Sequence, residues 1–524
     1  MLAHYYDVNM KDRFEELFGD LYIGSHPTPE RNQYLILNLN FAAIHADLDN
    51  YKEEMDKYSY RVFRAFCDRY QAILPANFAE RVLREQTAVD LLDCVCTECQ
   101  TAGLKLYLFI DEYDHFTNKI LSHPDAFSKY REETHGEGYI RKFYDVIKDG
   151  TNKSIERLFI TGVSPATMDD LTSGFNIGSN YSLQPQFNEM TGFTEEEVRQ
   201  MLTYYASLEP YNHTVEELLA TMKPYYDNYC FAEECYGQTT MYNSNMVLYF
   251  IDQYRNSLYR LPKDMLDANI RFDYEKIRMF IRKDKEFAHD ASIIQRLVQQ
   301  GFITGEIKSH FPAEAIGDPN NFISLLYYFG MITYGGSYMG DTKLVIPNEV
   351  VREQIFSYLL DTYQEVSLER SDYDKRLLAQ NMAWDGDWKP FFEYIAECMR
   401  RFSSQRDKQK GEAFVHGFTL AMTCQNRFWR PISELDNNQG YADIFLCPMV
   451  DIFKDMEHSY IVELKYVRSS EPQSRIETAR KEAAEQVRRY AQSDVVREGI
   501  RSTRLHKIVT VWYGTELAVC EEVE

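Results

Sequence analysis

Three short apolar segments, separated by long stretches of helical period, constrain the first third of the chain most strongly. The segments are Tyr34–Phe41, Leu104–Asp111 and Arg157–Gly162. The stretches between them include Tyr58–Leu74, which is closed by Pro75, and Ala79–Gln100. Strands that alternate with helices indicate a parallel sheet with crossover helices. We therefore expect an α/β fold at the start of this chain.

The composition favours a folded protein with several domains. The chain has 524 residues, which allows two to four domains of about 100–200 residues each. Hydrophobic residues make up 44%, which is enough for a core and excludes wholesale disorder. The sequence has neither an apolar run long enough for a membrane span nor the pattern of a secretory signal. Ten cysteines are ordinary for a reduced protein, so we expect a cytoplasmic location and no membrane partner.

The net charge of −24 is distributed unevenly along the chain. Residues 401–524 carry 18 Lys and Arg against 19 Asp and Glu, whereas residues 1–400 carry 39 against 62. A nearly neutral segment can contact phosphates through a local patch, but strong non-specific DNA affinity is not expected. The acidic body formed by the first 400 residues is a candidate surface for a protein partner.

The pattern becomes mainly helical between Thr194 and about residue 310. Thr194 precedes three Glu residues and is expected to cap a helix. Residues 322–356 then predict a helix, a hairpin around Gly335-Gly336 and Gly340, and a second helix. This order is typical of a winged-helix module, and any helix–hairpin connector gives the same pattern.

The last quarter of the chain predicts a second α/β segment. A polar helical stretch, Ser367–Asp387, forms the junction before it. The expected elements are a helix at Gly411–Thr423, strands at 441–447 and 459–466, a helix at 473–492 and a strand at 506–513.

An acidic strand end indicates a nucleotide site in the N-terminal half. The second apolar segment runs directly into Asp111 and Glu112, and ligands gather at the carboxyl ends of parallel strands. Asp111 can hold Mg²⁺ through water and Glu112 can orient the attacking water, which is the Walker B pattern. Thr161 ends the next strand, where it can sense a γ-phosphate. An ordinary solvent-exposed strand end is the alternative explanation of these residues. The phosphate-loop motif GxxxxGK[ST], which an ATP site of this kind requires, does not occur in the chain.

A second candidate site consists of Asp443 and the Glu463-Leu-Lys465 triplet. Residues two apart on a strand face the same side, so Glu463 and Lys465 project together, and Asp443 joins them if the two strands pair. Two carboxylates there would bind Mg²⁺ or Mn²⁺ and polarise a phosphodiester. Lys465 would stabilise the charge that develops on the phosphate. A surface Glu–Lys pair on a strand is the alternative explanation.

Two helical segments flank this pattern. The upstream segment carries Glu412 and, one turn further, His416. The downstream segment carries Gln486 and Tyr490 one turn apart, with basic neighbours that suit a phosphate backbone. An ordinary amphipathic helix is the alternative for the downstream segment.

The chain resembles bacterial AAA-ATPase-like proteins that carry a C-terminal PD-(D/E)XK nuclease-like domain. The segments that carry the resemblance in the first half are YYDVNMKDRFEELFGDLYIG, YLILNLNF, LFIDEYD, FITGVSP, NEMTGFTEEEV, YYDNYCF and MYNSNMVLYF. The matching residues in the last quarter are Glu412 on the acidic helix, Ala442 in place of the signature proline, Asp443, Glu463, Lys465, and Gln486 with Tyr490.

The resemblance implies an α/β multidomain protein with four parts. These are an incomplete P-loop NTPase-like parallel sheet (1–190), a helical lid (191–310), a winged-helix-like connector (311–375) and a restriction-endonuclease-like α/β domain (376–524). In the family the first helix follows the Walker A loop at once, so we expect the opening strand and phosphate loop to be missing here. ATP hydrolysis is then not expected, unless a longer native form supplies the loop and restores ATP and Mg²⁺ at Asp111, Glu112 and Thr161.

The resulting hypothesis is a Mg²⁺-dependent, nuclease-like protein that processes nucleic acid, in the first instance DNA, with an ATPase-derived regulatory module. Asp443 and Glu463 would bind the metal, and Lys465 would assist the transition state. Glu412 would complete the acid cluster, and Gln486 would act as an orienting residue. The alternative is a non-catalytic scaffold for protein interactions in which both sites are degenerate.

Overall fold

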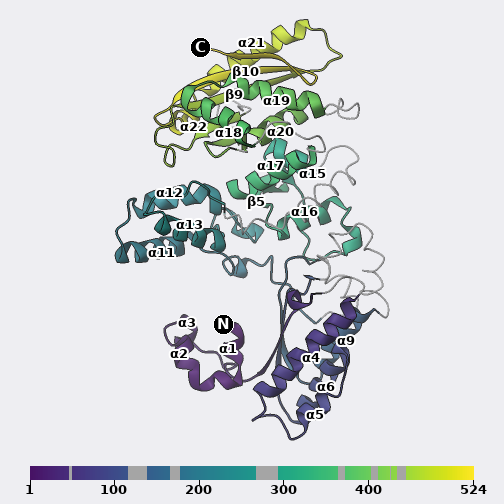
Figure 1. Ribbon diagram of the computed structural model, residues 1–524. Helices are drawn as coiled ribbons and strands as arrows, with labels where there is room; N and C mark the ends of the chain where they lie inside the picture. Colours follow the sequence, from purple (N-terminus) through teal and green to yellow (C-terminus); the bar gives the residue numbers. More distant parts are fainter. Residues whose placement is uncertain are drawn as a thin grey trace. The chain divides into compact units, whose positions relative to one another are not determined.

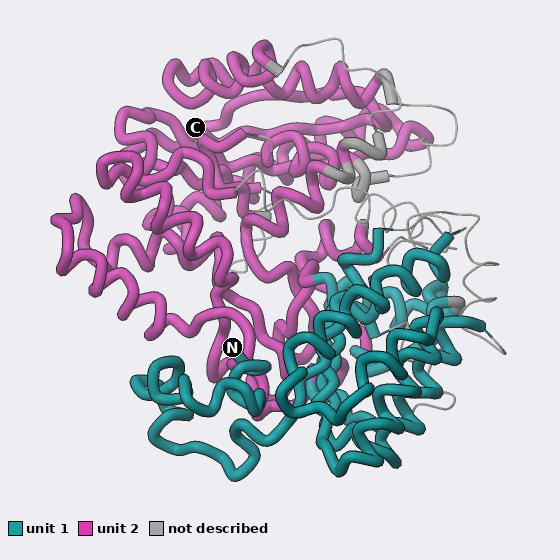
Figure 2. The backbone as a smooth tube through the Cα atoms, turned by 60° about the horizontal axis from the view of Figure 1, so that its bottom comes forward, with its two compact units in different colours: residues 1–181, 307–329 teal, residues 182–306, 330–524 magenta. Residues whose placement is uncertain are grey.

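The chain forms two compact units (Figure 2). The computed structural model describes residues 1–45, 50–115, 138–165, 177–266, 293–363, 372–402, 411–424, 426–433 and 444–524. Unit 1 contains Met1–Tyr181 and Ile307–Phe329, and unit 2 contains Ser182–Glu306 and Gly330–Glu524. Within the described part of the chain, no helix combines the length and apolar character needed to span a membrane.

Unit 1 is built on a sheet of three parallel strands in the order β1-β2-β3. The strands are β1 (Leu35–Asn40), β2 (Leu106–Asp111) and β3 (Ile155–Ile160). The central strand β2 is buried along its length except at Asp111, as expected of a parallel strand whose sheet is covered on both faces. The parallel sheet expected from the sequence is therefore confirmed.

Helices cover one face of this sheet, and the N-terminal segment lies against the other (Figure 1). The first group is α4 (Tyr51–Arg69), α5 (Phe78–Val82), α6 (Ala88–Thr101) and α9 (Tyr139–Gly150). The second is α1 (Leu2–Tyr6), η1 (Val8–Arg13), α2 (Phe14–Phe18) and α3 (Tyr22–Ser25). The single helix expected at 79–100 is two helices, because Thr87 caps a new helix by accepting a hydrogen bond from the Asp90 amide.

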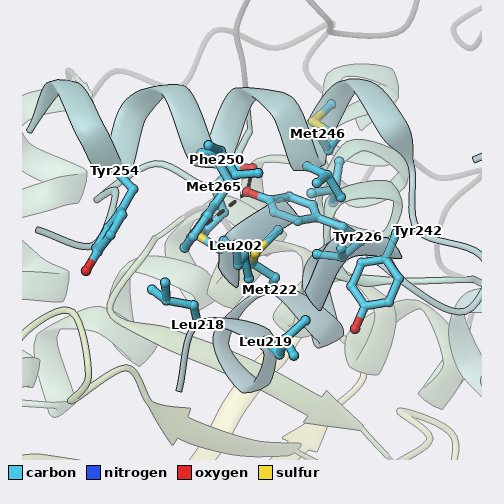
Figure 3. Close-up of a cluster of buried hydrophobic side chains, with 14 residues drawn as sticks. Leu202, Leu218, Leu219, Met222, Tyr226, Tyr242, Met246, Phe250, Tyr254 and Met265 are labelled. Carbon is cyan, nitrogen blue, oxygen red and sulfur yellow. Dashed lines mark hydrogen bonds between the residues drawn. The ribbon is translucent and has the colours of Figure 1, made fainter. Parts of the chain in front are cut away.

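Three helices with a common core begin unit 2. They are α11 (Glu195–Leu208), α12 (Val215–Tyr226) and α13 (Ser244–Asn256). Thr194 and Thr214 each form a capping box with the Glu three residues later, which confirms the helix start expected at Thr194. The core contains Met222, Tyr226 and Phe250, and Figure 3 shows the hydrogen bond of the Tyr226 hydroxyl to the Met265 carbonyl (2.8 Å).

A small antiparallel sheet with the order β4-β6-β5 follows. Its strands are β4 (Phe302–Thr304), β5 (Thr333–Tyr338) and β6 (Asp341–Val345), with α15 (Ile293–Gln300) before it and α17 (Glu349–Tyr363) after it. Helix α16 (Pro319–Tyr328) belongs to unit 1. The hairpin turns at Met339 and Gly340, which both have positive φ. The expected turn residues Gly335 and Gly336 instead lie inside β5, at a shift in register.

The C-terminal sheet has five strands in the order β11-β10-β9-β8-β7, of which only β9 and β10 are parallel. The strands are β7 (Trp429–Ser433), β8 (Ile444–Pro448), β9 (His458–Val467), β10 (Arg504–Tyr513) and β11 (Glu516–Glu522). Its helices are α18 (Asp372–Gln380), η6 (Asn381–Asp385), α19 (Lys389–Phe402), α20 (Gly411–Cys424), α21 (Ser474–Tyr490) and α22 (Asp494–Gly499). Figure 1 shows α21 on one side of the sheet and α19 and α20 on the other.

Candidate functional sites

Strand β9 brings Glu463 and Lys465 to the face of the sheet that α21 covers. Ile461 and Val467 of β9 share a hydrophobic cluster with Ala483 of α21. Side chains alternate along a strand, so Glu463 and Lys465 lie on the same face as Ile461 and Val467. The sequence placed these two side chains on one face, and the structure agrees.

Glu463 and Lys465 form an ion pair. The Lys465 Nζ lies 2.9 Å from the Glu463 Oε1. The Glu463 side chain is only 2% exposed, whereas that of Lys465 is 23% exposed. A carboxylate in such a place needs a cation, because an ion loses its hydration when it is buried. The pair keeps the negative charge of Glu463 buried and leaves the positive charge of Lys465 partly exposed to solvent.

The strand that follows Asp443 pairs directly with β9. Ile444 lies opposite Val462, and Phe445 lies opposite Ile461, in an antiparallel arrangement. The sequence analysis made the meeting of Asp443 with Glu463 depend on this pairing of strands. Asp443 itself lies outside the residues that the structure describes. Its chain neighbour Ile444 begins β8 and pairs with Val462, the residue before Glu463.

The helices that carry the remaining predicted residues are present. Gln486 lies on α21, next to Val487 of the cluster that packs on β9. Its Oε1 is buried and accepts no hydrogen bond from any described residue. Glu412 lies in the first turn of α20, and its side chain is outside the described atoms. Helix α20 packs against β7 and β9.

These residues fit a divalent cation in the chemistry of their donors. Carboxylate and amide oxygens are the ligands that hard cations prefer, and the buried Gln486 Oε1 is an oxygen that still needs a partner. No group of three or more His, Cys, Asp and Glu side chains able to hold a metal occurs within the described ranges, which omit Asp443 and the Glu412 side chain.

The other candidate site is a polar row across the carboxyl ends of β1, β2 and β3 in unit 1. Thr161 Oγ1 donates to Asp111 Oδ1 (2.6 Å), and Asn40 Nδ2 is 3.4 Å from Asp111 Oδ2. The register places Asn40 opposite Asp111, so all three strands contribute to one row. The sequence analysis named Asp111 and Thr161 but missed Asn40. The alternation of Asn38 and Asn40 at the end of an apolar strand was the available signal.

The turn after β2 is fixed to the segment after β3. Glu112 has a left-handed backbone (φ 56), which an ordinary residue adopts only when its surroundings enforce it. The buried Asp114 accepts hydrogen bonds from the amides of Val163 and Ser164 (2.7 Å for Ser164). A Cβ added at Gly162 would come within 2.5 Å of the Tyr113 ring. The position of Glu112 beside Asp111 is thus set by close packing of two loops.

Comparisons with known proteins give matches at the two ends of the chain. Residues 1–172 match the family model described as predicted AAA-ATPase, and residues 410–522 match that of the PD-(D/E)XK nuclease superfamily. No curated protein matches the chain. Among solved structures, the Aeropyrum pernix ORC2 protein in ADPNP-ADP complexes covers 68% of this chain and 86% of its own. At 13% identity and a TM-score of 0.27, this similarity supports no inference.

The two matches coincide with the two candidate sites. The first contains Asn40, Asp111 and Thr161, and the second contains Glu463, Lys465 and Gln486. The chain therefore carries a predicted AAA-ATPase-like domain at its N-terminus and a PD-(D/E)XK nuclease superfamily domain at its C-terminus.

Proposed function

We propose that this chain is a nuclease-like protein that uses Mg²⁺ or Mn²⁺ to hydrolyse phosphodiester bonds in DNA. The observation that carries the proposal is the buried Glu463, which is held by Lys465 on a strand that pairs with the strand following Asp443. A buried ion pair adds net stability only when its geometry is excellent, so such a pair is weak evidence for a purely structural role. A cation site gives this pair a use.

Each residue of the site has a separate role in the proposal. Asp443 and Glu463 are the metal ligands, and a bound divalent cation would polarise the phosphodiester and lower the pKa of a bound water. Lys465 places its ammonium group at the rim, where it can balance the charge that develops on the phosphate. Gln486 offers its buried Oε1 to a water or ligand. Glu412 is proposed as a further acid, which would have to reach the site from α20, on the side of the sheet opposite to α21.

The remaining parts of the chain are assigned by the same proposal. Residues 1–190 form an ATPase-derived module, 191–310 a helical lid, 311–375 a winged-helix-like connector and 376–524 the nuclease-like domain. The hairpin of β5 and β6, followed by α17, supports the connector. The row of Asn40, Asp111 and Thr161 would hold Mg²⁺ with ATP only where a phosphate loop is also supplied.

Cleavage of supercoiled plasmid by the full chain in Mg²⁺ or Mn²⁺ tests this function. We expect nicked and linear products from the parent chain, and a loss of at least 100-fold in rate for Asp443→Ala, Glu463→Gln and Lys465→Ala. The matched control is Glu482→Gln, because this side chain is exposed on α21 and has no role in the proposal. This control should cleave at the parent rate.

Equal cleavage by the parent chain and all three site variants would contradict the proposal. Absence of cleavage together with absence of Mn²⁺ binding would favour the alternative, a scaffold that binds a protein partner through its acidic body. A calorimetric titration with Mn²⁺ separates the two functions, because a nuclease site should bind the ion and lose it in Glu463→Gln.

A further inference from the structure

Strand β3 ends the sheet of unit 1 with an unpaired edge. Its inner side pairs with β2, and just beyond the strand the Thr161 amide donates to the Ile110 carbonyl (2.8 Å). Successive residues of a strand direct their backbone groups to opposite sides, so the amides and carbonyls of Leu158 and Ile160 point away from β2. Within the described part of the chain, no strand pairs with these groups and no hydrogen bond reaches them. Such an edge is a template for a further strand.

The opposite edge of the same sheet, on β1, is closed by side chains. The Tyr70 hydroxyl accepts a hydrogen bond from the Ile36 amide (2.9 Å), and the Tyr58 hydroxyl accepts one from the Asn40 amide (2.7 Å). Both tyrosines belong to α4 or follow it directly, so this helix covers the outer side of β1. A further strand can therefore join the sheet at β3 more readily than at β1.

The unpaired edge is partly apolar. Leu158, Phe159 and Ile160 form the second half of β3, and all three side chains are only partly buried. Charged residues commonly protect a sheet edge from other chains, and Glu156 and Arg157 supply such charges only in the first half of the strand. The second half therefore combines unpaired backbone groups with apolar side chains that solvent reaches.

The sequence of this edge is complementary to itself. From Arg157 to Thr161 the residues are polar, apolar, aromatic, apolar and polar, which is the same order from either end. Antiparallel pairing of two copies about Phe159 places Leu158 of each copy opposite Ile160 of the other. Both residues direct their backbone groups outward, so these are hydrogen-bonded pairs as well as apolar ones. A contact that is its own complement is the kind that forms twofold dimers.

The charges of the edge favour the same arrangement. Arg157, near the start of β3, has a side chain that is 48% exposed, although it pairs with Glu30. The pairing about Phe159 sets Arg157 of one copy opposite Thr161 of the other. The Thr161 hydroxyl donates to the exposed Asp111 (2.6 Å), so the cation of one copy comes beside an acid of the other. The twofold axis forms this contact twice.

We propose that β3 is the contact surface between two copies of this chain, paired antiparallel about Phe159. The two three-stranded sheets then form one continuous sheet, and each copy adds Arg157 beside the polar row of Asn40, Asp111 and Thr161 of the other. A strand edge of this length buries less surface than a standard interface, so the dimer is expected to be weak. This inference concerns unit 1 and does not depend on the nuclease function.

Sedimentation equilibrium of the full chain from about 1 to about 100 µM tests the proposal, and we expect a dimer that dissociates on dilution. Leu158→Lys and Ile160→Glu should each weaken the dimer at least tenfold, because each sets a charge opposite an apolar residue twice. An equimolar mixture of the two variants should dimerise again, since the new lysine then faces the new glutamate. Tyr60→Lys, at an exposed position of α4, is the control and should dimerise like the parent.

Hydrogen exchange of the parent chain provides a second test that needs no variant. Residues 156–162 should exchange at least fivefold more slowly at the highest concentration than at the lowest, whereas β1 should not change. A parent chain that stays monomeric up to about 100 µM would overturn the proposal. A dimer that neither variant weakens, with no protection of residues 156–162, would place the contact elsewhere and also overturn it. Recovery in the mixture supports the pairing about Phe159.

Discussion

A single buried carboxylate dominates the energetics of the C-terminal site. Glu463 is 2% exposed and its Oε1 is 2.9 Å from the Lys465 ammonium group. Loss of one partner from such a pair leaves the other charge buried, and this cost exceeds the net stabilisation that the intact pair provides. The two residues should therefore behave as a unit in stability measurements.

We predict that Lys465→Met lowers the free energy of unfolding by roughly 2 kcal/mol, because the Glu463 charge stays buried. The double variant Lys465→Met with Glu463→Gln should recover more than half of this loss. Urea denaturation of the three chains measures the coupling. Lys481→Met, at an exposed position of α21, is the control and should unfold like the parent. Additive losses in the double variant would contradict the prediction.

Residue-level prediction succeeded where one element carried the whole pattern. The period of two along β9 was sufficient to place Glu463 beside Lys465. The hydrogen bond from Thr161 to Asp111 depends on the register between two strands, and the two residues are 50 positions apart in the chain. The amino-acid sequence of the two strands does not specify this register. Asn40 was missed for the same reason.

At the scale of elements, irregular strands were the ones that the sequence did not reveal. Strand β7 is short and contains Pro431, which interrupts the apolar pattern, yet proline is tolerated on an edge strand. Strand β11 (ELAVCEE) has only a short apolar run between acids and is half-exposed. The regular strands β8, β9 and β10 were all predicted, within a few residues at their ends.

A row of hydrogen-bonded side chains connects β9, β10 and β11 of the C-terminal sheet. His458 Nδ1 lies 2.8 Å from His506 Nε2, and His506 Nδ1 lies 2.9 Å from Glu522 Oε1. These residues come from β9, β10 and β11, respectively. Burial, with smaller effects of His458 and Arg504, lowers the pKa of His506 from its usual 6.5, although Glu522 opposes the shift. His506 is therefore neutral in the folded protein at neutral pH.

The lowered pKa of His506 predicts a loss of stability in mild acid. Below its usual value of 6.5 the unfolded chain takes up a proton that the folded chain does not, so unfolding becomes easier as the pH falls towards the lowered pKa. Urea midpoints at pH 7.5 and pH 5 should differ less in His506→Gln than in the parent chain. His26→Gln, at an exposed position, should keep the parent difference. Identical pH dependence in all three chains would contradict this prediction.

The charge of the whole molecule opposes binding of an anionic polymer. The net charge is −24, and the C-terminal quarter has one acidic residue more than it has basic residues. A phosphate backbone therefore needs either a local basic patch or a bound cation to approach the acidic site. A divalent cation at Glu463 would serve for binding as well as for hydrolysis.

We predict that the full chain binds a labelled DNA duplex at least tenfold more weakly in EDTA than in Ca²⁺, which accepts the same oxygen ligands as Mg²⁺. Fluorescence anisotropy at fixed ionic strength measures the two dissociation constants. Glu463→Gln should reduce the difference between the dissociation constants in EDTA and in Ca²⁺, whereas Glu482→Gln should leave it unchanged. Equal affinity in EDTA and Ca²⁺ would show that the cation has no part in DNA binding.

The way in which the chain alternates between its two units affects its synthesis on the ribosome. Unit 1 takes its last segment, Ile307–Phe329, only after Ser182–Glu306 of unit 2 has been translated. At the usual speed of elongation, this segment follows the start of unit 1 after a delay on the order of ten seconds. Unit 1 is therefore complete only after the first part of unit 2 has been synthesised.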